Sequence, residues 1–142
     1  MVLSMPIRKA EARDAEAVAG LLGELGYPTT RAAAAERLAA LDGRDPVFVL
    51  DEDGATIGVI ALHIGPELHR DRPVTHIVAL VVTDAMRGRD KGLVLVQHAI
   101  AVARDRGCGL IELTSRLERE SAHGFYEAAG FTRTAHRFSR DL

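Results

Sequence analysis

The sequence contains no tryptophan, and its aromatic residues make up only 4% of 142 positions. So few aromatic side chains disfavour a surface on which the bases of single-stranded nucleic acid stack. The formal net charge of −2 also lacks the basic excess that is typical of general nucleic-acid binders. We therefore expect no nucleic-acid partner.

Cysteines and long apolar runs are equally scarce. Cys108 is the single cysteine of the sequence, so an internal disulfide is excluded. No apolar run approaches the ~18 residues of a membrane-spanning helix. Residues 1–5 lack the basic and apolar regions of a signal peptide. These features predict a cytoplasmic protein without a membrane partner.

What the sequence does contain is typical of one globular domain. Hydrophobic residues make up 47% of the chain and charged residues 27%, which are ordinary proportions. A chain of this length buries enough surface to fold without disulfides or metals. We place the domain at residues 5–142.

Hydrophobic periodicity and turn residues predict an order of helices and strands. We expect strands at residues 5–9, 47–50, 56–64, 75–82, 110–114 and 131–139. We expect one helix that begins at Asp14 and ends at Gly26-Tyr27-Pro28, and a second helix after a cap at Thr29 or Thr30. Further helices are expected at 92–106 and 120–129. Asp53-Gly54 is typical of a hairpin turn, whereas the later strand-helix-strand unit requires parallel strands. The order predicts an α/β (α+β) fold, with a mixed sheet between helices and the strand at 75–82 central and covered on both faces.

The turn at residues 86–92 carries the most informative group of residues. A helix begins at its end, so unpaired N–H groups and the positive end of the helix dipole face the turn. Arg87, Arg89 and Lys91 add positive charge, and Gly88 lets a ligand approach the backbone. These features favour a phosphate-binding turn, and the alternative is a solvated turn with ordinary glycine caps. Neither the P-loop pattern nor the dinucleotide-binding glycine pattern is present.

Two segments resemble the GNAT superfamily of N-acetyltransferases. Residues 80–92 read Leu-Val-Val-Thr-Asp-Ala-Met-Arg-Gly-Arg-Asp-Lys-Gly and are similar to the family's acyl-CoA-binding segment, Arg/Gln-x-x-Gly-x-Gly/Ala. Residues 119–131 contain Ala-x-x-Phe-Tyr-x-x-x-Gly-Phe, a pattern very common in the family. The resemblance implies a single GNAT-like domain with a mixed, mostly antiparallel sheet of six to seven strands. It also implies an acetyl-CoA-dependent N-acetyltransferase.

The resemblance assigns contacts to acetyl-CoA, the expected co-substrate. Backbone amides of Leu80, Val81 and Val82 would hold the pantetheine arm as an added strand does, and would polarise the thioester carbonyl. The turn at residues 87–92 would hold the pyrophosphate. The expected cofactor-binding residues are Leu80, Val81, Val82, Arg87, Gly88, Arg89, Asp90, Lys91, Gly92, Arg119 and Tyr126.

Three residues are candidates for proton transfer and acceptor binding. Tyr126 resembles the family's general acid, which protonates the leaving thiolate; the alternative is that it only packs. His76 lies where many members have a glutamate acting as general base, and a histidine can take an amine proton near neutral pH. The alternative is a strand histidine whose ring is satisfied by a neighbour. Glu112 on the next strand is the alternative base, or a carboxylate that binds the amine, so His76 and Glu112 are the expected substrate-binding residues.

Asp90 departs from the family pattern, because it stands where the motif has its first glycine. A carboxylate beside a pyrophosphate is repelled, although Asp90 could instead point outward as a helix N-cap. This departure raises an alternative function, a catalytically weak acyl-CoA-binding or regulatory module with the same fold.

The acceptor is expected to be a small-molecule or peptide amine that attacks directly in a ternary complex. The charged loop at residues 67–72 could line the acceptor site, although we favour a solvated loop. His63, His69 and His76 are six and seven residues apart, which does not match a tight metal site, so we expect no metal. GNAT proteins often dimerise, so a homodimer is one expected state, with no interface assigned.

Overall fold

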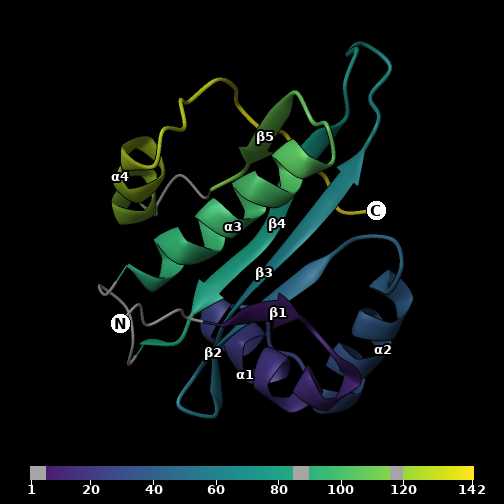
Figure 1. Cartoon of the computed structure of the whole chain (residues 1–142), viewed down its shortest axis with the longest axis vertical. Coiled ribbons are helices and arrows are strands. Elements are labelled where there is room, and N and C mark those ends of the chain that lie inside the picture. The colour runs from purple at the N-terminus through teal and green to yellow at the C-terminus, as the bar shows by residue number, and fades with distance from the viewer. Residues whose placement is uncertain (1–5, 85–89, 116–119) are drawn as a thin grey trace.

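The computed structural model describes residues 6–84, 90–115 and 120–142 (Figure 1). Its strands are β1 (Ile7–Lys9), β2 (Val47–Glu52), β3 (Ala55–Gly65), β4 (Val74–Val82) and β5 (Leu110–Leu113). Its helices are α1 (Ala15–Leu25), α2 (Arg31–Leu41), α3 (Lys91–Asp105) and α4 (Glu120–Ala128), with a 3-10 turn at Ala12–Asp14 before α1.

The sheet is mixed, as the sequence predicts. Its strands follow the order β1-β2-β3-β4-β5, and neighbours pair antiparallel except for β4 and β5, which are parallel. The helix α3 connects these two strands and packs on β3, β4 and β5 (Figure 1). A crossover helix of this kind is what a parallel pair requires.

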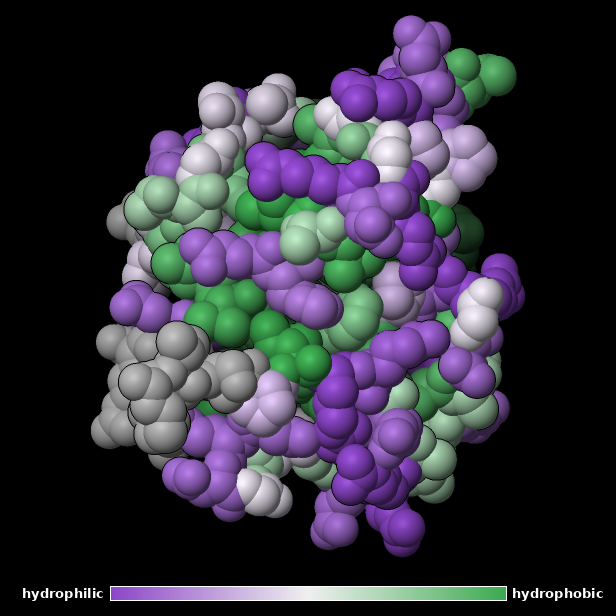
Figure 2. All heavy atoms as spheres, viewed as in Figure 1, coloured by the Kyte–Doolittle hydropathy of each residue, from purple (hydrophilic) through white to green (hydrophobic). Residues whose placement is uncertain are grey.

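Side chains that alternate along the strands build a core on each face of the sheet. Val49, Val59 and Val81 pack with α1 and α2 on one face. Their neighbours in sequence, including Leu50 and Ile60, pack with α3 on the other. On the face seen in Figure 2, hydrophilic side chains border hydrophobic ones in the region of α3, as a helix that buries one side requires. No helix within the described ranges has both the length and the apolarity to cross a membrane.

Local signals in the sequence fix several element ends. The Thr30 hydroxyl oxygen accepts a hydrogen bond from the Ala33 N–H at 3.0 Å and so caps α2. Gly26 adopts a left-handed φ of 108° after α1, where glycine costs no steric strain. Asp53 and Gly54 have φ of 50° and 81°, as the hairpin between β2 and β3 requires. These three predictions are confirmed.

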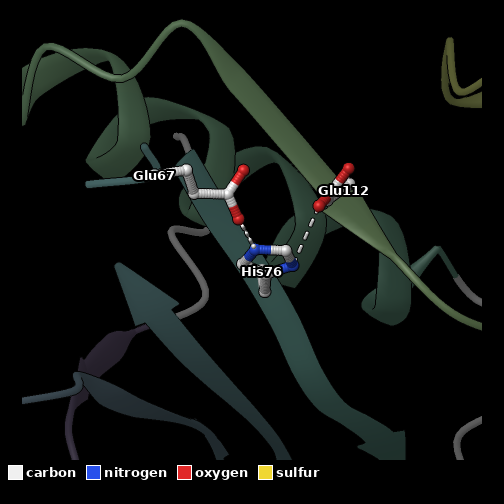
Figure 3. A group of neighbouring side chains, drawn as sticks. All are labelled: Glu67, His76 and Glu112. Atoms are coloured by element: carbon white, nitrogen blue, oxygen red, sulfur yellow. Dashed lines mark hydrogen bonds and ion pairs between the residues drawn. The ribbon is translucent and has the colours of Figure 1, made fainter. Parts of the chain in front are cut away.

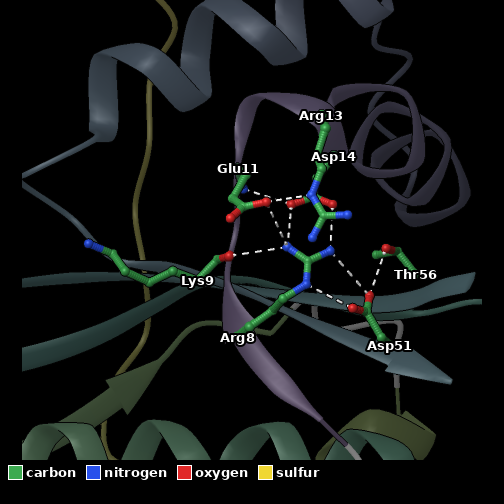
Figure 4. Close-up of polar contacts among 7 residues, drawn as sticks. All are labelled: Arg8, Lys9, Glu11, Arg13, Asp14, Asp51 and Thr56. Carbon is green, nitrogen blue, oxygen red and sulfur yellow. Dashed lines mark hydrogen bonds and ion pairs between the residues drawn. The ribbon is translucent and has the colours of Figure 1, made fainter. Parts of the chain in front are cut away.

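A network around Arg8 ties β1 to the rest of the domain (Figure 4). Its guanidinium donates two hydrogen bonds of 2.8 Å to Asp14, which is only 4% exposed, and a third of 2.8 Å to Asp51 on β2. Thr56 on β3 donates a fourth bond to Asp51 at 2.9 Å. The hydrogen bonds from Arg8 lower the pKa of both carboxyl groups and raise the pKa of Arg8.

The prediction of a strand at residues 131–139 is wrong. Within residues 131–142, which the structure describes, there is neither strand nor helix, and the side chains from residue 132 onward are exposed. Phe131 packs against the core below α3, whereas Phe138 is 95% exposed. An odd and an even position point to opposite faces of a strand, so Phe131 and Phe138 could not have shared a buried face. The described residues therefore form five strands rather than six to seven.

The strand β4 is less covered than expected. The middle strand of the described sheet is β3, and β4 lies beside it. The register between β3 and β4 shifts so that Ala61 faces Ala79 and Leu62 faces Ile77. Val78 is therefore an extra residue without an opposite partner on β3, and it is 63% exposed. A bulge of this kind bends a strand and redirects its side chains, often next to a functional site.

Candidate active site

A cavity of about 310 Å³ opens where β4 and β5 cease to pair. Pairing between the two strands ends at Ile77 and Leu113. The residues that follow on both strands line the cavity together with the end of α1 and one side chain of α4. The lining consists of Glu24, Leu25, Tyr27, Ile77, Val78, Ala79, Leu80, Leu113, Thr114, Ser115 and Tyr126.

Two of the predicted site residues, Leu80 and Tyr126, meet at this cavity. Val81 and Val82, also predicted to bind cofactor, direct their side chains into the two cores. They could therefore contact a cofactor only through their backbone. Tyr126 is half-buried, and its ring makes an edge contact with Phe131 at a centroid distance of 6.0 Å. Its position is thus compatible with a role at the cavity and with a packing role.

The first turn of α3 holds the remaining described residues of the predicted phosphate-binding turn. Arg87, Gly88, Arg89 and Arg119 lie outside the described residues. Asp90 is the N-cap residue of α3, but its side chain makes no capping hydrogen bond. Its φ of 59° is left-handed, a conformation that glycine adopts freely and aspartate tolerates better than most residues.

Two contacts in this turn were not predicted. The Lys91 ammonium lies 2.8 Å from Oε1 of Glu52 on β2, and its side chain is only 11% exposed, so part of its charge is directed at the sheet. Gly92 faces α4, because a Cβ at that position would lie 3.4 Å from Cζ of Phe125. Both contacts join segments far apart in sequence, and no local pattern signals either.

Glu24 binds the two residues that follow β4. Its carboxylate accepts hydrogen bonds from the Thr83 hydroxyl at 3.0 Å and from the Asp84 N–H at 2.8 Å. Glu24 lies at the end of α1 and also lines the cavity. Sequence reasoning missed this residue, because 59 positions separate it from Thr83.

His76 and Glu112, the predicted acceptor residues, lie side by side on β4 and β5 (Figure 3). The Nδ1 atom of His76 lies 3.1 Å from Oε1 of Glu112. Its Nε2 atom lies 3.2 Å from Oε2 of Glu67, which belongs to the loop between β3 and β4. The next residues along the two strands, Ile77 and Leu113, line the cavity, whereas Glu67, His76 and Glu112 do not. The side chains of all three are 30–42% exposed.

Glu67 is the residue of this group that sequence reasoning did not assign. The loop at residues 67–72 was expected to be solvated, yet it brings Glu67 to the imidazole. Glu67 also lies 3.6 Å from the Arg70 guanidinium. On the same side of the sheet, His63 lies opposite His76 on β3, and its ring contacts Asp45 at 2.9 Å. The sequence of a charged loop does not indicate which of its residues will contact a histidine on a neighbouring strand.

The group can hold or transfer a proton. A neutral imidazole carries one N–H, so it donates to one of the two carboxylates, whereas a protonated imidazole donates to both. A ring between two carboxylates is therefore held in one orientation.

Comparison with known proteins places this geometry in context. Residues 13–131 match the Acetyltransferase (GNAT) family. The aminoalkylphosphonate N-acetyltransferase of Salmonella typhimurium strain LT2 is 32% identical over 141 residues, which cover 96% of this chain and 90% of the relative. The family resemblance inferred from the two sequence motifs is confirmed.

Solved structures share the whole architecture. A putative acetyltransferase from Agrobacterium tumefaciens strain C58 superposes with a TM-score of 0.86 at 29% identity, over 97% of this chain and 100% of that one. A structure described as a transcriptional regulator from Bacillus halodurans C-125 gives a TM-score of 0.90 at 24% identity, over 98% and 100% of the two chains. At that identity the second likeness shows the fold alone.

Proposed function

The chain belongs to the GNAT acetyltransferase family, and from this premise we propose that it transfers an acetyl group from acetyl-CoA to a primary amine. The amine attacks the thioester directly in a ternary complex. The observation that carries the proposal is the cavity between β4 and β5, which Leu80 and Tyr126 line and which begins one residue beyond His76 and Glu112 on the two strands. As a member of a family of N-acetyltransferases, the chain is an acyltransferase.

In this proposal the cofactor lies along β4 and ends at the start of α3. The backbone of Leu80, Val81 and Val82 holds the pantetheine arm, and an N–H in this stretch polarises the thioester carbonyl. Residues 87–92, together with Arg119, hold the pyrophosphate. The end of the strand pairing at Ile77 supports this placement, because it leaves the following part of β4 beside a cavity instead of beside β5.

Two side chains carry the proton steps. His76 accepts the proton of the attacking amine, directly or through water, while Glu67 and Glu112 keep its ring oriented. Glu112 is the alternative base and also attracts the acceptor's ammonium group. Tyr126, which lines the cavity from α4, protonates the thiolate that leaves.

For the acceptor we propose a small primary amine, with aminoalkylphosphonates as the first compounds to test. The support is the relative that acts on this class and aligns over nearly the full length of both chains. Arg137 adds a cation for an anionic end of the acceptor, since it donates a 3.0 Å hydrogen bond to the hydroxyl of Thr114, which lines the cavity. A peptide amine is the alternative acceptor.

The experiment is a thioester-cleavage screen of the full chain with acetyl-CoA, longer acyl-CoAs and a broad amine panel. We expect amine-dependent release of CoA, fastest with a small amine that carries an anionic group. Acetyl-CoA binding by calorimetry, with no release for any amine, would instead favour the second candidate, a binding or regulatory module. Asp90 in place of the motif glycine is the observation behind that candidate.

Two further proposals accompany the function. We propose that the protein acts in the cytoplasm and that its working form is a homodimer, a state common in the family. Light scattering of the full chain at micromolar concentration tests the second proposal, and a monomer mass would contradict it.

A further inference from the structure

Glu24, in the last turn of α1, connects that helix to Thr83 and Asp84, the residues that follow β4. We propose that Glu24 is a positioning residue for acetyl-CoA. It fixes the direction in which the chain leaves β4 and so places the turn at residues 87–92 for the pyrophosphate. The inference rests on the proposed function, because it concerns the binding of the same cofactor.

The chain is held from two sides where it leaves β4. The Thr83 N–H donates a 2.8 Å hydrogen bond to the carbonyl oxygen of Ile57 on β3, which continues the sheet one residue beyond Val82. The Thr83 side chain and the Asp84 N–H bind Glu24 instead. The sheet therefore fixes the backbone of Thr83, and α1 extends this restraint to the residue after it.

The two donors to Glu24 lie on consecutive residues and favour different oxygens of one carboxylate. The Asp84 N–H binds Oε1 at 2.8 Å, and the Thr83 hydroxyl lies 3.0 Å from Oε2. A carboxylate bound at both oxygens cannot rotate freely without breaking one of the bonds. Hydrogen bonds to an ionised acceptor are also stronger than those to a neutral one, so the pair restrains both residues although Glu24 is exposed.

The helix itself gains nothing from a carboxylate at this position. The C-terminal end of a helix carries a partial negative charge, so a cation stabilises it and an acid does not. The last turn of α1 contains no basic residue, and Glu24 is placed there. The favourable contacts of Glu24 are those with Thr83 and Asp84, which points to a role outside its own helix.

This restraint acts between the two parts of the proposed cofactor site. The backbone at residues 80–82, just before Thr83, is proposed to hold the pantetheine arm, and the turn at residues 87–92 is proposed to hold the pyrophosphate. One fixed direction between them reduces the conformational freedom that is lost when a single ligand binds both parts. Loss of Glu24 should therefore weaken the contacts of the pyrophosphate and leave those of the pantetheine arm unchanged.

Calorimetric titration of the full chain with acetyl-CoA, without an acceptor, tests the role. Glu24→Ala removes both oxygens and keeps a good helix former, so we expect about 10-fold weaker binding, equivalent to about 1.4 kcal/mol. Glu24→Gln keeps an oxygen that can accept from the Asp84 N–H, so its affinity should stay within about threefold of the unmodified chain. Circular dichroism checks that each variant is folded.

Acetyl-pantetheine separates positioning of the turn from general damage to the site. This ligand carries the thioester and the pantetheine arm but has no pyrophosphate. Its affinity is measured by displacement of a fluorescent CoA, whose own affinity for each variant is determined first. We expect Glu24→Ala to bind acetyl-pantetheine as the unmodified chain does. An equal loss for acetyl-pantetheine and acetyl-CoA would overturn the positioning role.

Two further variants show whether Glu24 acts through Thr83. Thr83→Val removes the hydroxyl, and when it is combined with Glu24→Ala the loss of acetyl-CoA affinity should be smaller than the sum of the two separate losses. Additive losses would contradict the proposed connection. Glu16→Ala removes the same kind of exposed carboxylate from the first turn of α1 and should leave the affinity unchanged.

Failure of this inference is distinct from failure of the proposed function. Equal acetyl-CoA affinity of Glu24→Ala and the unmodified chain would overturn the role of Glu24 alone. Absence of acetyl-CoA binding by the unmodified chain would overturn both. The binding measurements need no turnover, so their result does not depend on whether a suitable amine has been found.

Discussion

His76 on β4 lies directly opposite Glu112 on β5, and 3.1 Å separates Nδ1 of the first from Oε1 of the second. The parallel register of the two strands produces this contact, and one residue further along both strands the pairing ends and the cavity begins. The proposed proton acceptor is thus held by regular sheet at the point where the sheet opens. Rigid placement of this kind is what a catalytic base requires.

Tyr126→Phe tests the proposed general acid. The substitution keeps the aromatic contact with Phe131 and removes the hydroxyl. Because a general acid typically contributes at least about 10²-fold, we expect kcat to fall by that factor with acetyl-CoA affinity nearly unchanged. Steady-state kinetics on an active amine gives kcat, and calorimetry gives the acetyl-CoA affinity. Turnover equal to that of the unmodified chain would mean that Tyr126 only packs and that water supplies the proton.

His76→Gln tests the proposed base. The amide keeps a hydrogen-bonding side chain beside Glu67 and Glu112 but cannot take the proton. We expect a loss of kcat/KM smaller than that of Tyr126→Phe, and one that shrinks at high pH, where the amine is already deprotonated. A loss that stays constant across the pH profile would assign His76 a positional role only.

Asp90→Gly tests whether the carboxylate opposes the cofactor. Glycine restores the family pattern at a residue whose φ of 59° suits it, so we expect acetyl-CoA to bind more tightly. The free energy of unfolding should change by less than about 1 kcal/mol, because the relief of strain offsets the added entropy of the unfolded chain. Weaker binding would give the carboxylate a positive role in ordering the turn.

A matched control exists in the hairpin between β2 and β3. Asp53 is the other described non-glycine residue with positive φ, at 50°. Asp53→Gly makes the same chemical change in a turn that does not line the cavity, so acetyl-CoA affinity should stay the same.

The ends of elements could be predicted from the sequence, because they depend on local chemistry. The cap at Thr30 and the left-handed Gly26 are examples. The contacts that complete the site could not, because they join distant segments through side chains of ordinary loops and helices, as Glu67 and Glu24 do. The prediction of a strand at residues 131–139 failed, because Phe131 and Phe138 would lie on opposite faces of such a strand.

Acid should destabilise the protein through Asp14. Its pKa in the folded chain lies below the ordinary 3.8, chiefly because Arg8 donates hydrogen bonds to its carboxylate. A lowered carboxyl pKa contributes stability that is fully present above the unfolded value and is lost as the pH falls below it. We expect Asp14→Asn to cost about 1.5–3 kcal/mol near pH 7, the range for hydrogen bonds to charged groups. Chemical denaturation at several pH values should show a flatter acid limb for the variant.

His98 should affect the free energy of unfolding at higher pH values than Asp14 does. Burial lowers its pKa from the ordinary 6.5, and its Nε2 atom has no hydrogen-bond partner among the described residues. The unfolded chain then binds the proton more readily, so stability falls as the pH drops below about 6.5. His98→Leu keeps an apolar contact with Phe48 and should remove this slope. Denaturation midpoints between pH 5 and pH 7 that change equally in both proteins would contradict this role.

The central claim is acetyl transfer to an amine, and product analysis tests it most directly. The full chain is incubated with acetyl-CoA and an aminoalkylphosphonate, and the products are identified by mass spectrometry while free CoA thiol is measured in parallel. The account predicts an N-acetylated amine formed in equal amount to the released CoA, with both rates reduced together in Tyr126→Phe. Release of CoA without acetylated amine, or bound acetyl-CoA that is never turned over with any amine of the panel, would contradict it.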